Sequence, residues 1–314
     1  MSDSMCFTAD RGDARLRLDQ ILVRHIDDVS RWSRTLAQRW IASGAVSVDG
    51  RVVRRAAASV QAGAVVTVAI PASAVRRTAP GAEDSALDIL FEDASFIAVN
   101  KPAGVVVHPT YRHVHGTLVN ALLWRLHAQA PLEPATTSPS RRPGGIRPGI
   151  VTRLDKDTSG VVIAAVTPGV HAILQRDAAA GLVAKQYLAV VKGTPSPRRG
   201  RVELPLSHDP VDRRRIVVSP GGVASETRYE VVRERNGISL VRCEIVMGRT
   251  HQIRVHLSHL GCPIVGDRVY GEPDPRIARQ ALHAWRVSLS HPLTRARIDL
   301  EALLPRDMAA LLDC

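Results

Sequence analysis

The chain has 314 residues, of which 45% are hydrophobic, and a formal net charge of +12 at pH 7. This hydrophobic content excludes wholesale disorder, and no apolar run reaches the roughly 18 residues of a membrane span, so we expect a cytoplasmic protein with no membrane partner. The excess of basic over acidic residues indicates a polyanionic partner, of which nucleic acid is the usual one.

The first predicted unit covers residues 15–70 and follows an N-terminal segment, residues 1–14, whose polar composition predicts a loose conformation. The stretch "ARLRLDQILVRHI" carries leucine and isoleucine at helical spacing, and "RWSRTLAQRWIAS" is predicted to form a second helix that ends at Gly44. Two short β-branched runs then flank Asp49-Gly50, a strong signal for a type I′ hairpin. A further strand, "AVVTVAI", completes the unit.

Several arginines of this unit are predicted to lie on its polar surface, where their simplest interpretation is a solvated face. However, the pattern of "RLDQIL", "SR" and "IASGAVSVDGRVV" resembles the small RNA-binding domain known from ribosomal protein S-four. The resemblance implies a small α/β domain that binds RNA, with Arg31, Arg34 and Arg51 as candidate contacts.

Residues 71–86 are predicted to be a linker, because they are rich in Pro, Ala and Ser and show no hydrophobic period. The second unit, residues 87–314, opens with two strand-like runs and an amphipathic helix, "GTLVNALLWRLHAQ". Residues 130–148 are rich in Pro, Ser and Gly and are predicted to form an exposed insertion. Beyond them, strands outnumber helices, and the helices interrupt the strands irregularly. This order predicts an α+β fold with a mixed, mainly antiparallel sheet.

One polar stretch of the second unit, "GIVTRLDKDTSG" at residues 149–160, leads directly into the buried strand pattern "GVVIAAVT". Asp155 and Asp157 lie two residues apart there, and Asp, Ser and Thr side chains commonly bond to their own backbone in turns. On this pattern alone, a well-capped turn is the simplest interpretation. A phosphate-binding loop is not favoured, because the stretch lacks the GK[ST] of such loops.

A second cluster, "GRTHQIRVHLSHLG", predicts a helix over residues 249–261 with His251 and Arg254 on one face. A metal site is not favoured, because the histidines lack zinc-motif spacing and the four cysteines form no CxxC pair. An arginine on a half-buried helix needs an anion, since burial of its unpaired charge is costly. We expect Asp155 to be that anion, in a two-pronged contact with Arg254.

The segments "NKPAGVVVHP", "RLDKDTSG", "KQYLAVVKG", "GRTHQIRVHLSHLGCPIVGDRVYG" and "ALHAWRVSLSHP" occur in this order between about residue 87 and the C-terminus. Together they resemble the RluA/RluD-type pseudouridine synthases. With the RNA-binding module in front, the resemblance implies an isomerase that converts uridines of large-subunit ribosomal RNA to pseudouridine. Ribosomal RNA, free or in assembling ribosomal particles, is then the expected partner.

The resemblance also assigns roles to individual residues. Asp155 is similar to the catalytic carboxylate that acts at the ribose–uracil junction, and Arg254 to the arginine that pairs with it. Tyr187 is similar to the tyrosine that stacks near the base and is thought to take part in proton removal. Arg153 is similar to the residue that fills the gap left by the flipped nucleotide. The chain departs from the family at Thr152, where many members have His.

The implied chemistry breaks a C–N bond and rejoins the ring through carbon without a redox step or an external group, so we expect no cofactor. Two alternatives stay open: a tRNA-directed pseudouridine synthase, and a non-catalytic RNA-binding protein of ribosome assembly. A hydrolase with a carboxylate nucleophile is less favoured, because no second carboxylate lies at an interpretable spacing. No long hydrophobic stripe is left over for a subunit interface, so we expect a monomer.

Overall fold

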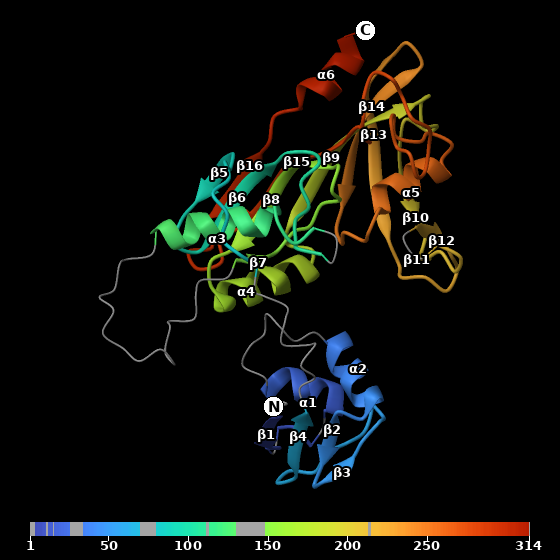
Figure 1. Ribbon diagram of the computed structural model, residues 1–314. Coiled ribbons are helices and arrows are strands. Elements are labelled where there is room, and N and C mark those ends of the chain that lie inside the picture. Colours follow the sequence, from blue (N-terminus) through green and yellow to red (C-terminus); the bar gives the residue numbers. More distant parts are fainter. Residues whose placement is uncertain are drawn as a thin grey trace. The chain divides into compact units, whose positions relative to one another are not determined.

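The computed structural model describes residues 4–10, 12–14, 16–25, 34–69, 80–110, 113–129, 148–212 and 215–313. The chain divides into two compact units, Met1–Gly81 and Ala82–Cys314 (Figure 1). Arg31, residues 71–79 of the predicted linker and residues 130–147 of the predicted insertion lie outside the described residues. Within the described chain, no helix combines the length and the apolar character needed to cross a membrane.

The N-terminal unit packs two helices against a four-stranded antiparallel sheet. Its described elements are β1 (Ser4–Thr8), α1 (Leu18–His25), α2 (Arg34–Ser43), β2 (Val46–Val48), β3 (Arg51–Val52) and β4 (Val65–Ala69). Leu18, Ile21 and Leu22 of α1 and Trp40 and Ile41 of α2 are buried in one core with valines of the sheet. The helical spacing of these apolar residues therefore predicted the correct buried faces.

The turn between β2 and β3 confirms the predicted hairpin, because Asp49 and Gly50 have φ angles of 48° and 76°, as a type I′ turn requires. The predicted loose conformation of residues 1–14 is wrong for Ser4–Thr8, which forms β1 and pairs antiparallel with β4. The physical reason is that Met5 and Phe7, on alternate positions, pack against the core of the unit. Their short apolar alternation is masked in the sequence by the polar residues around it.

The C-terminal unit is built on a ten-stranded sheet in the order β10-β13-β14-β9-β15-β8-β6-β5, with β16 beside β15 and β7 beside β8. Its described strands are β5 (Ile89–Glu92), β6 (Phe96–Lys101), β7 (Gly149–Ile150), β8 (Ser159–Ala165), β9 (Ala184–Lys192), β10 (Arg199–Glu203), β11 (Leu206–His208), β12 (Ile216–Val218), β13 (Glu226–Arg235), β14 (Ile238–Ile245), β15 (Leu282–Ser290) and β16 (Arg297–Glu301). Its described helices are α3 (Leu118–Gln129), α4 (Pro168–Ala179), α5 (Gln252–His259) and α6 (Arg306–Asp313). All pairings are antiparallel except that of β15 with β8, so the predicted α+β fold with a mixed, mainly antiparallel sheet is confirmed.

Helices α3 and α4 cover opposite faces of this sheet. Ile97 and Val99 of β6 pack with α3, whereas Phe96 and Ala98 of the same strand pack with α4, as the alternation of side chains along a strand requires. Ala82 to Ala86 belong to this unit rather than to the predicted linker. Glu83 shows why, since its carboxylate accepts hydrogen bonds from the backbone N–H of Gly116 and from the ring of His115.

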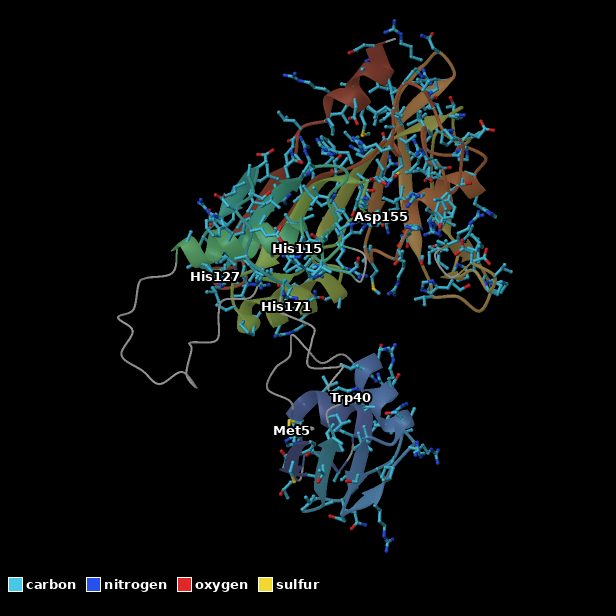
Figure 2. All side chains as sticks on the ribbon, viewed as in Figure 1. Met5, Trp40, His115, His127, Asp155 and His171 are labelled. Carbon is cyan, nitrogen blue, oxygen red and sulfur yellow. The ribbon has the colours of Figure 1, made fainter. Side chains whose placement is uncertain are left out.

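The central strands bring three segments to one place in the sheet. β8 follows the "RLDKDTSG" stretch, β15 lies between β8 and β9, and α5 packs into the same hydrophobic cluster as residues of β9 and β15. Gly160 makes the β8–β15 contact possible, because a Cβ there would lie 2.2 Å from the carbonyl oxygen of Ala284. Figure 2 shows Asp155 near the middle of the C-terminal unit.

Candidate active site

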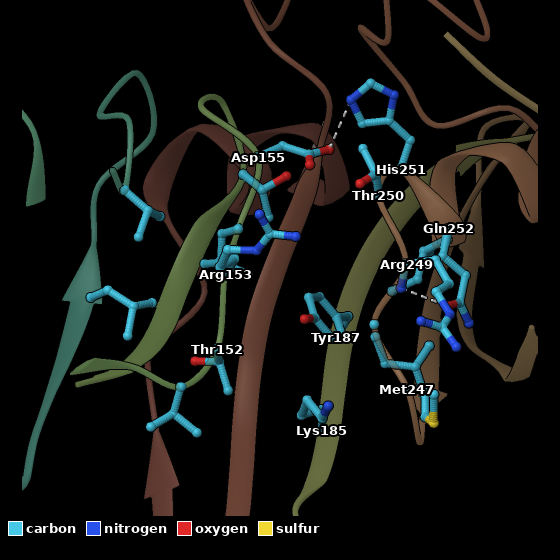
Figure 3. Close-up of a pocket in the computed structure, with 18 of the residues that line it drawn as sticks. Thr152, Arg153, Asp155, Lys185, Tyr187, Met247, Arg249, Thr250, His251 and Gln252 are labelled. Carbon is cyan, nitrogen blue, oxygen red and sulfur yellow. Dashed lines mark hydrogen bonds and ion pairs between the residues drawn. The ribbon is translucent and has the colours of Figure 1, made fainter. Parts of the chain in front are cut away.

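Asp155 lies in the connection between β7 and β8, whose backbone is held at both ends. The hydroxyl of Thr152 accepts the N–H of Ile163 at 3.0 Å, and the carbonyl of Asp155 accepts the N–H of Thr158 at 3.2 Å. Thr152, at the position where the family often has His, therefore satisfies a buried backbone donor of β8. The loop leaves the Asp155 side chain 25% exposed and directed into a cavity (Figure 3).

Lys101, the last residue of β6, stabilises the same loop through hydrogen bonds of its side chain. Its side chain is fully buried, and its ammonium donates to the carbonyl oxygens of Pro102, Val105 and Lys156 at 2.7, 2.8 and 3.0 Å. The last of these carbonyls belongs to the residue next to Asp155. Burial lowers the pKa of Lys101 to about 8, so the ammonium is still charged at neutral pH. Lys101 was not singled out in the sequence, because nothing local indicates that its side chain points inward.

We expect the Lys101→Met variant to lack a rise in the unfolding free energy that the wild type shows as the pH increases from about 8 to 10.5. The pKa of Lys101 is about 8 in the folded protein, below its ordinary value of 10.5, so between these values the unfolded chain binds more protons and wild-type stability rises with pH. Over this window the wild type should gain about 3 kcal/mol relative to the variant. Denaturant unfolding across the window measures this difference, and parallel curves for the two proteins would contradict it.

Arg254 lies on α5 and joins two carboxylates in the middle of the site. Its Nη1 donates to Oδ2 of Asp155 at 2.9 Å, while its Nε and Nη2 donate to the two oxygens of Asp267 at 2.7 and 2.9 Å. The predicted partnership of Arg254 with Asp155 is therefore present. The predicted two-pronged contact is wrong for Asp155, because the fork of the guanidinium faces Asp267 instead.

Asp267 is the main acidic residue that the sequence analysis missed. It is fully buried and also accepts the backbone N–H groups of Val269 and Tyr270. Burial alone would raise its pKa, but the hydrogen bonds and charge of Arg254 lower it, while the pKa of Arg254 is raised against its own desolvation by Asp267 and Asp155. A signal existed in the sequence: a buried guanidinium has five N–H donors, more than Asp155 alone can accept.

His251 approaches Asp155 from the residue before α5. Its backbone is left-handed, with φ of 55°, so the predicted helix over residues 249–261 begins only at Gln252. Its Nδ1 lies 2.8 Å from the hydroxyl of Tyr270, which also accepts the N–H of Ile216 at 2.8 Å. Since this hydroxyl has no other acceptor among the described residues, its proton points to Nδ1, and a neutral imidazole then carries its own proton on Nε2.

The protonated nitrogen Nε2 of His251 lies 3.7 Å from Oδ2 of Asp155 (dashed line in Figure 3). Burial and the charge of Arg254 lower the pKa of His251 against the opposing charge of Asp155, which favours the neutral ring. Arg254 and His251 thus both approach the same oxygen of Asp155, Oδ2. Within the described residues, Oδ1 of Asp155 accepts no hydrogen bond and is the unengaged oxygen of a side chain that lines the cavity.

Tyr187 lies on β9 and lines the same cavity (Figure 3). Its side chain is 8% exposed, and burial together with the nearby charge of Asp155 raises its pKa. The phenol is therefore protonated at neutral pH. Its ring is available for contact with a flat ligand, but a phenolate is not present in the resting protein.

The cavity has a volume of about 520 Å³, within the range of roughly 300–1,000 Å³ typical of small-molecule sites. It is lined by Asp155, Tyr187 and Arg254, and Arg153 reaches into it from the loop before Asp155 (Figure 3). The structure thus brings together four residues that the sequence indicated. Asp157 lines no part of it, in keeping with its interpretation as a turn residue.

The arginines predicted to contact RNA in the N-terminal unit differ in their surroundings. Arg51 is exposed on β3. Arg34 is also exposed, but its Nε donates to Asp19, a fully buried carboxylate that also binds Arg17 and Gln38. Arg34 therefore has a structural partner in addition to its exposed surface.

One set of side chains in the described residues has ligand atoms close enough for a metal ion: Asp10, Asp13 and His25 of the N-terminal unit. Arg24 forms ion pairs with both carboxylates there, at 3.0 and 2.7 Å. The guanidinium of Arg24 therefore already pairs with both carboxylates of this cluster. In the described chain, no comparable cluster lines the cavity around Asp155.

Comparison with protein families gives two matches. A family described as RNA pseudouridylate synthase matches residues 95–259, and the S4 domain matches residues 29–66. The first range includes Asp155, Tyr187 and Arg254.

Relatives match over nearly the whole chain. The uncharacterized RNA pseudouridine synthase YlyB of Bacillus subtilis is 38% identical over 310 residues, covering 98% of this chain and 96% of that protein. The ribosomal large subunit pseudouridine synthase D of Nitrosomonas europaea is 40% identical, covering 95% and 84%. The solved structure of human RNA pseudouridylate synthase domain containing 4 covers 72% of this chain and 91% of its own, with a TM-score of 0.55 and 24% identity, which concerns the fold.

Proposed function

Because the chain belongs to the RNA pseudouridylate synthase family and is therefore an isomerase, we propose that it converts specific uridines of large-subunit ribosomal RNA to pseudouridine, with Asp155 as the catalytic carboxylate. The observation that carries the proposal is the position of Asp155, a carboxylate in a cavity with one oxygen held by the buried Arg254. The choice of large-subunit RNA rests on the relative from Nitrosomonas europaea and on the S4 domain.

The target uridine must leave its stack before its glycosidic bond can reach Asp155, at a cost of a few kcal/mol. Arg153 extends into the cavity two residues before Asp155. We assign to Arg153 the role of filling the gap that the extruded nucleotide leaves in the RNA, because a planar guanidinium can stack on bases and contact phosphate. RNA in an assembling particle offers the same uridine as free RNA, and both are substrates under this proposal.

The reaction conserves all atoms of the nucleotide. The bond between N1 of uracil and C1′ of ribose breaks, the ring turns, C5 bonds to C1′, and the proton from C5 is released while N1 takes one up. Oδ1 of Asp155 is the oxygen free to act at C1′, because Arg254 engages Oδ2. Tyr187 keeps its proton at neutral pH, so we assign its ring to contact with uracil and its hydroxyl to a hydrogen bond. Its part in removing the C5 proton requires that the phenol first pass its own proton on.

The direct test is to map pseudouridine in unmodified RNA after incubation with the purified protein. Large-subunit ribosomal RNA, small-subunit ribosomal RNA and tRNA serve as parallel substrates. We expect new pseudouridines at a few positions of the large-subunit RNA alone. Modification of tRNA instead would replace the proposed substrate, and tight binding without pseudouridine in any RNA would refute catalysis.

We expect the Arg51→Met variant to bind large-subunit ribosomal RNA less tightly and with a weaker salt dependence. Each phosphate contact that is lost lowers the slope of log K against log salt by about 0.7 to 0.9, and Arg51 is exposed on β3. Filter binding over a series of salt concentrations measures the slope. Arg297→Met is the control, because Arg297 is also exposed but pairs with Asp299. Equal slopes for Arg51→Met and wild type would mean that Arg51 is merely solvated.

A further inference from the structure

Arg249 has a buried donor without an acceptor. Among the described residues, its Nε is the one buried side-chain nitrogen or oxygen atom without a hydrogen-bond partner. Arg249 lines the cavity from the segment before α5 (Figure 3). An unsatisfied buried donor of a charged group costs about 1–3 kcal/mol or more, so its persistence points to an acceptor supplied by a ligand.

The position of Arg249 is built into the fold. Its backbone N–H donates to Oε1 of Gln252 at 3.0 Å (dashed line in Figure 3). The amide of Gln252 is buried and donates in turn to the carbonyl of Glu226 and the hydroxyl of Thr227 on β13. Strand β13 therefore holds Gln252 in place, and Gln252 in turn holds the backbone of Arg249. Such anchoring prepares a binding group before the ligand arrives.

A second cation lines the same cavity from another element. Lys185 precedes Tyr187 by two residues on β9, so both side chains lie on one face of the strand. It is half-buried, and its ammonium has no ion pair or hydrogen bond with any described residue. Burial is the cause of its lowered pKa. Figure 3 shows Lys185 on the side of Tyr187 away from Asp155.

The charges around the cavity do not balance internally. Arg254 shares its single positive charge between Asp155 and Asp267, which leaves these three groups with one net negative charge. Lys185 and Arg249 add two positive charges for which the described chain supplies no carboxylate partner, so a net positive charge remains. A neutral uracil ring does not compensate a charge, whereas a phosphate does, and a guanidinium matches its geometry with two parallel hydrogen bonds.

We propose that Arg249 and Lys185 form an anion subsite that binds one backbone phosphate beside the flipped uridine. The inference rests on the proposed function, because it takes the ligand to be RNA with its ribose at Asp155. The subsite fixes where the strand enters the cavity. Binding at this subsite adds affinity that is the same for the ground state and the transition state, because the phosphate does not take part in the reaction.

The test compares Arg249→Met, Lys185→Met and the double variant in the full-length protein, with unmodified large-subunit ribosomal RNA as the probe. Each single variant should raise KM about tenfold while kcat stays within about twofold, because a phosphate contact acts on binding. Each should also lower the salt slope of RNA binding by about 0.7. Lys192→Met and Arg199→Met are the controls: Lys192 lies on the same strand but pairs with Glu272, and Arg199 is exposed on β10. Both should behave as wild type.

Two further variants separate charge from folding. Arg249→Lys and Lys185→Arg keep the charge and should keep the salt slope, even if the Met variants unfold. An unchanged KM and salt slope in both Met variants would overturn the subsite, as would a loss confined to kcat. The binding slope needs no turnover, so it tests the subsite even if mapping finds no pseudouridine and the proposed function fails.

A second readout locates the phosphate. In a short RNA that contains a mapped target uridine, each phosphate in turn is replaced by an uncharged methylphosphonate. We expect one replacement near the uridine to weaken binding to the wild type about tenfold and to leave binding to the double variant unchanged. Equal sensitivity of both proteins at every position would overturn the proposal.

Discussion

The Asp155→Asn variant is expected to form pseudouridine at least about 10,000-fold more slowly than the wild type, the scale of loss seen when a catalytic nucleophile is removed. Asn has the same shape, and its amide oxygen still accepts a hydrogen bond from Arg254. The variant lacks the negative charge and the unengaged oxygen Oδ1 that the reaction requires. Single-turnover measurement of pseudouridine in ribosomal RNA gives the rate.

The fold of this variant should survive, for a structural reason. Arg254 keeps its two hydrogen bonds to Asp267 when the charge of Asp155 is removed. Stability and RNA affinity should therefore stay close to wild type. Asp157→Asn is the matched control, two residues away in the same loop, and should keep its activity within about tenfold. Activity of Asp155→Asn within tenfold of wild type would show that another group performs the chemistry.

The second large effect is expected at Arg254. The Arg254→Met variant removes the cation from between two carboxylates, and one of them, Asp267, is fully buried. An uncompensated buried charge destabilises a protein by about 3–5 kcal/mol. Pseudouridine formation should also fall by about 1,000-fold, as for other groups that orient charge in an active site. Denaturant unfolding and the pseudouridine assay measure the two effects.

A double variant separates the structural role of Arg254 from its role at Asp155. Combining Arg254→Met with Asp267→Asn removes both buried charges, and Asn still accepts the backbone N–H groups of Val269 and Tyr270. Stability should return to within about 1 kcal/mol of wild type, because a buried ion pair can often be replaced at little cost. Activity should not return. If pseudouridine formation does return in the double variant, Arg254 contributes only to stability, and its hydrogen bond to Asp155 is not needed for catalysis.

The elements with strong periodicity were predictable from the sequence. The buried faces of α1 and α2 and the hairpin at Asp49-Gly50 follow from local residue preferences. The strand β1 was not predictable, because five residues carry too little pattern. Strands β10, β11 and β12 are three to five residues long, which is too short for a clear hydrophobic pattern; the bounds of β10 follow from its pairing with β13, and those of β11 and β12 from their pairing with each other.

The site was predictable where chemistry restricts the choice of partner. A buried arginine demands an anion, and this argument joined Arg254 to Asp155 across 99 residues. It did not find Asp267, because the count of carboxylates around a guanidinium depends on how deeply it is buried. Lys101 and Tyr270 were not predicted for a similar reason. The ammonium of Lys101 donates to backbone carbonyls, and the hydroxyl of Tyr270 contacts a backbone N–H and the ring of His251, and only the fold brings these groups together.

By itself the sequence determined the candidate residues of the proposed site, the family resemblance and the order of the main elements, because these depend on local spacing. Only the tertiary structure decided which oxygen of Asp155 stays unengaged and which carboxylate takes the fork of Arg254. It also decided that Arg249 and Lys185 line the cavity without a carboxylate partner in the described chain. The physical reason is that hydrogen bonds and charge pairing change over a few tenths of an ångström, and the packing of distant strands sets those distances.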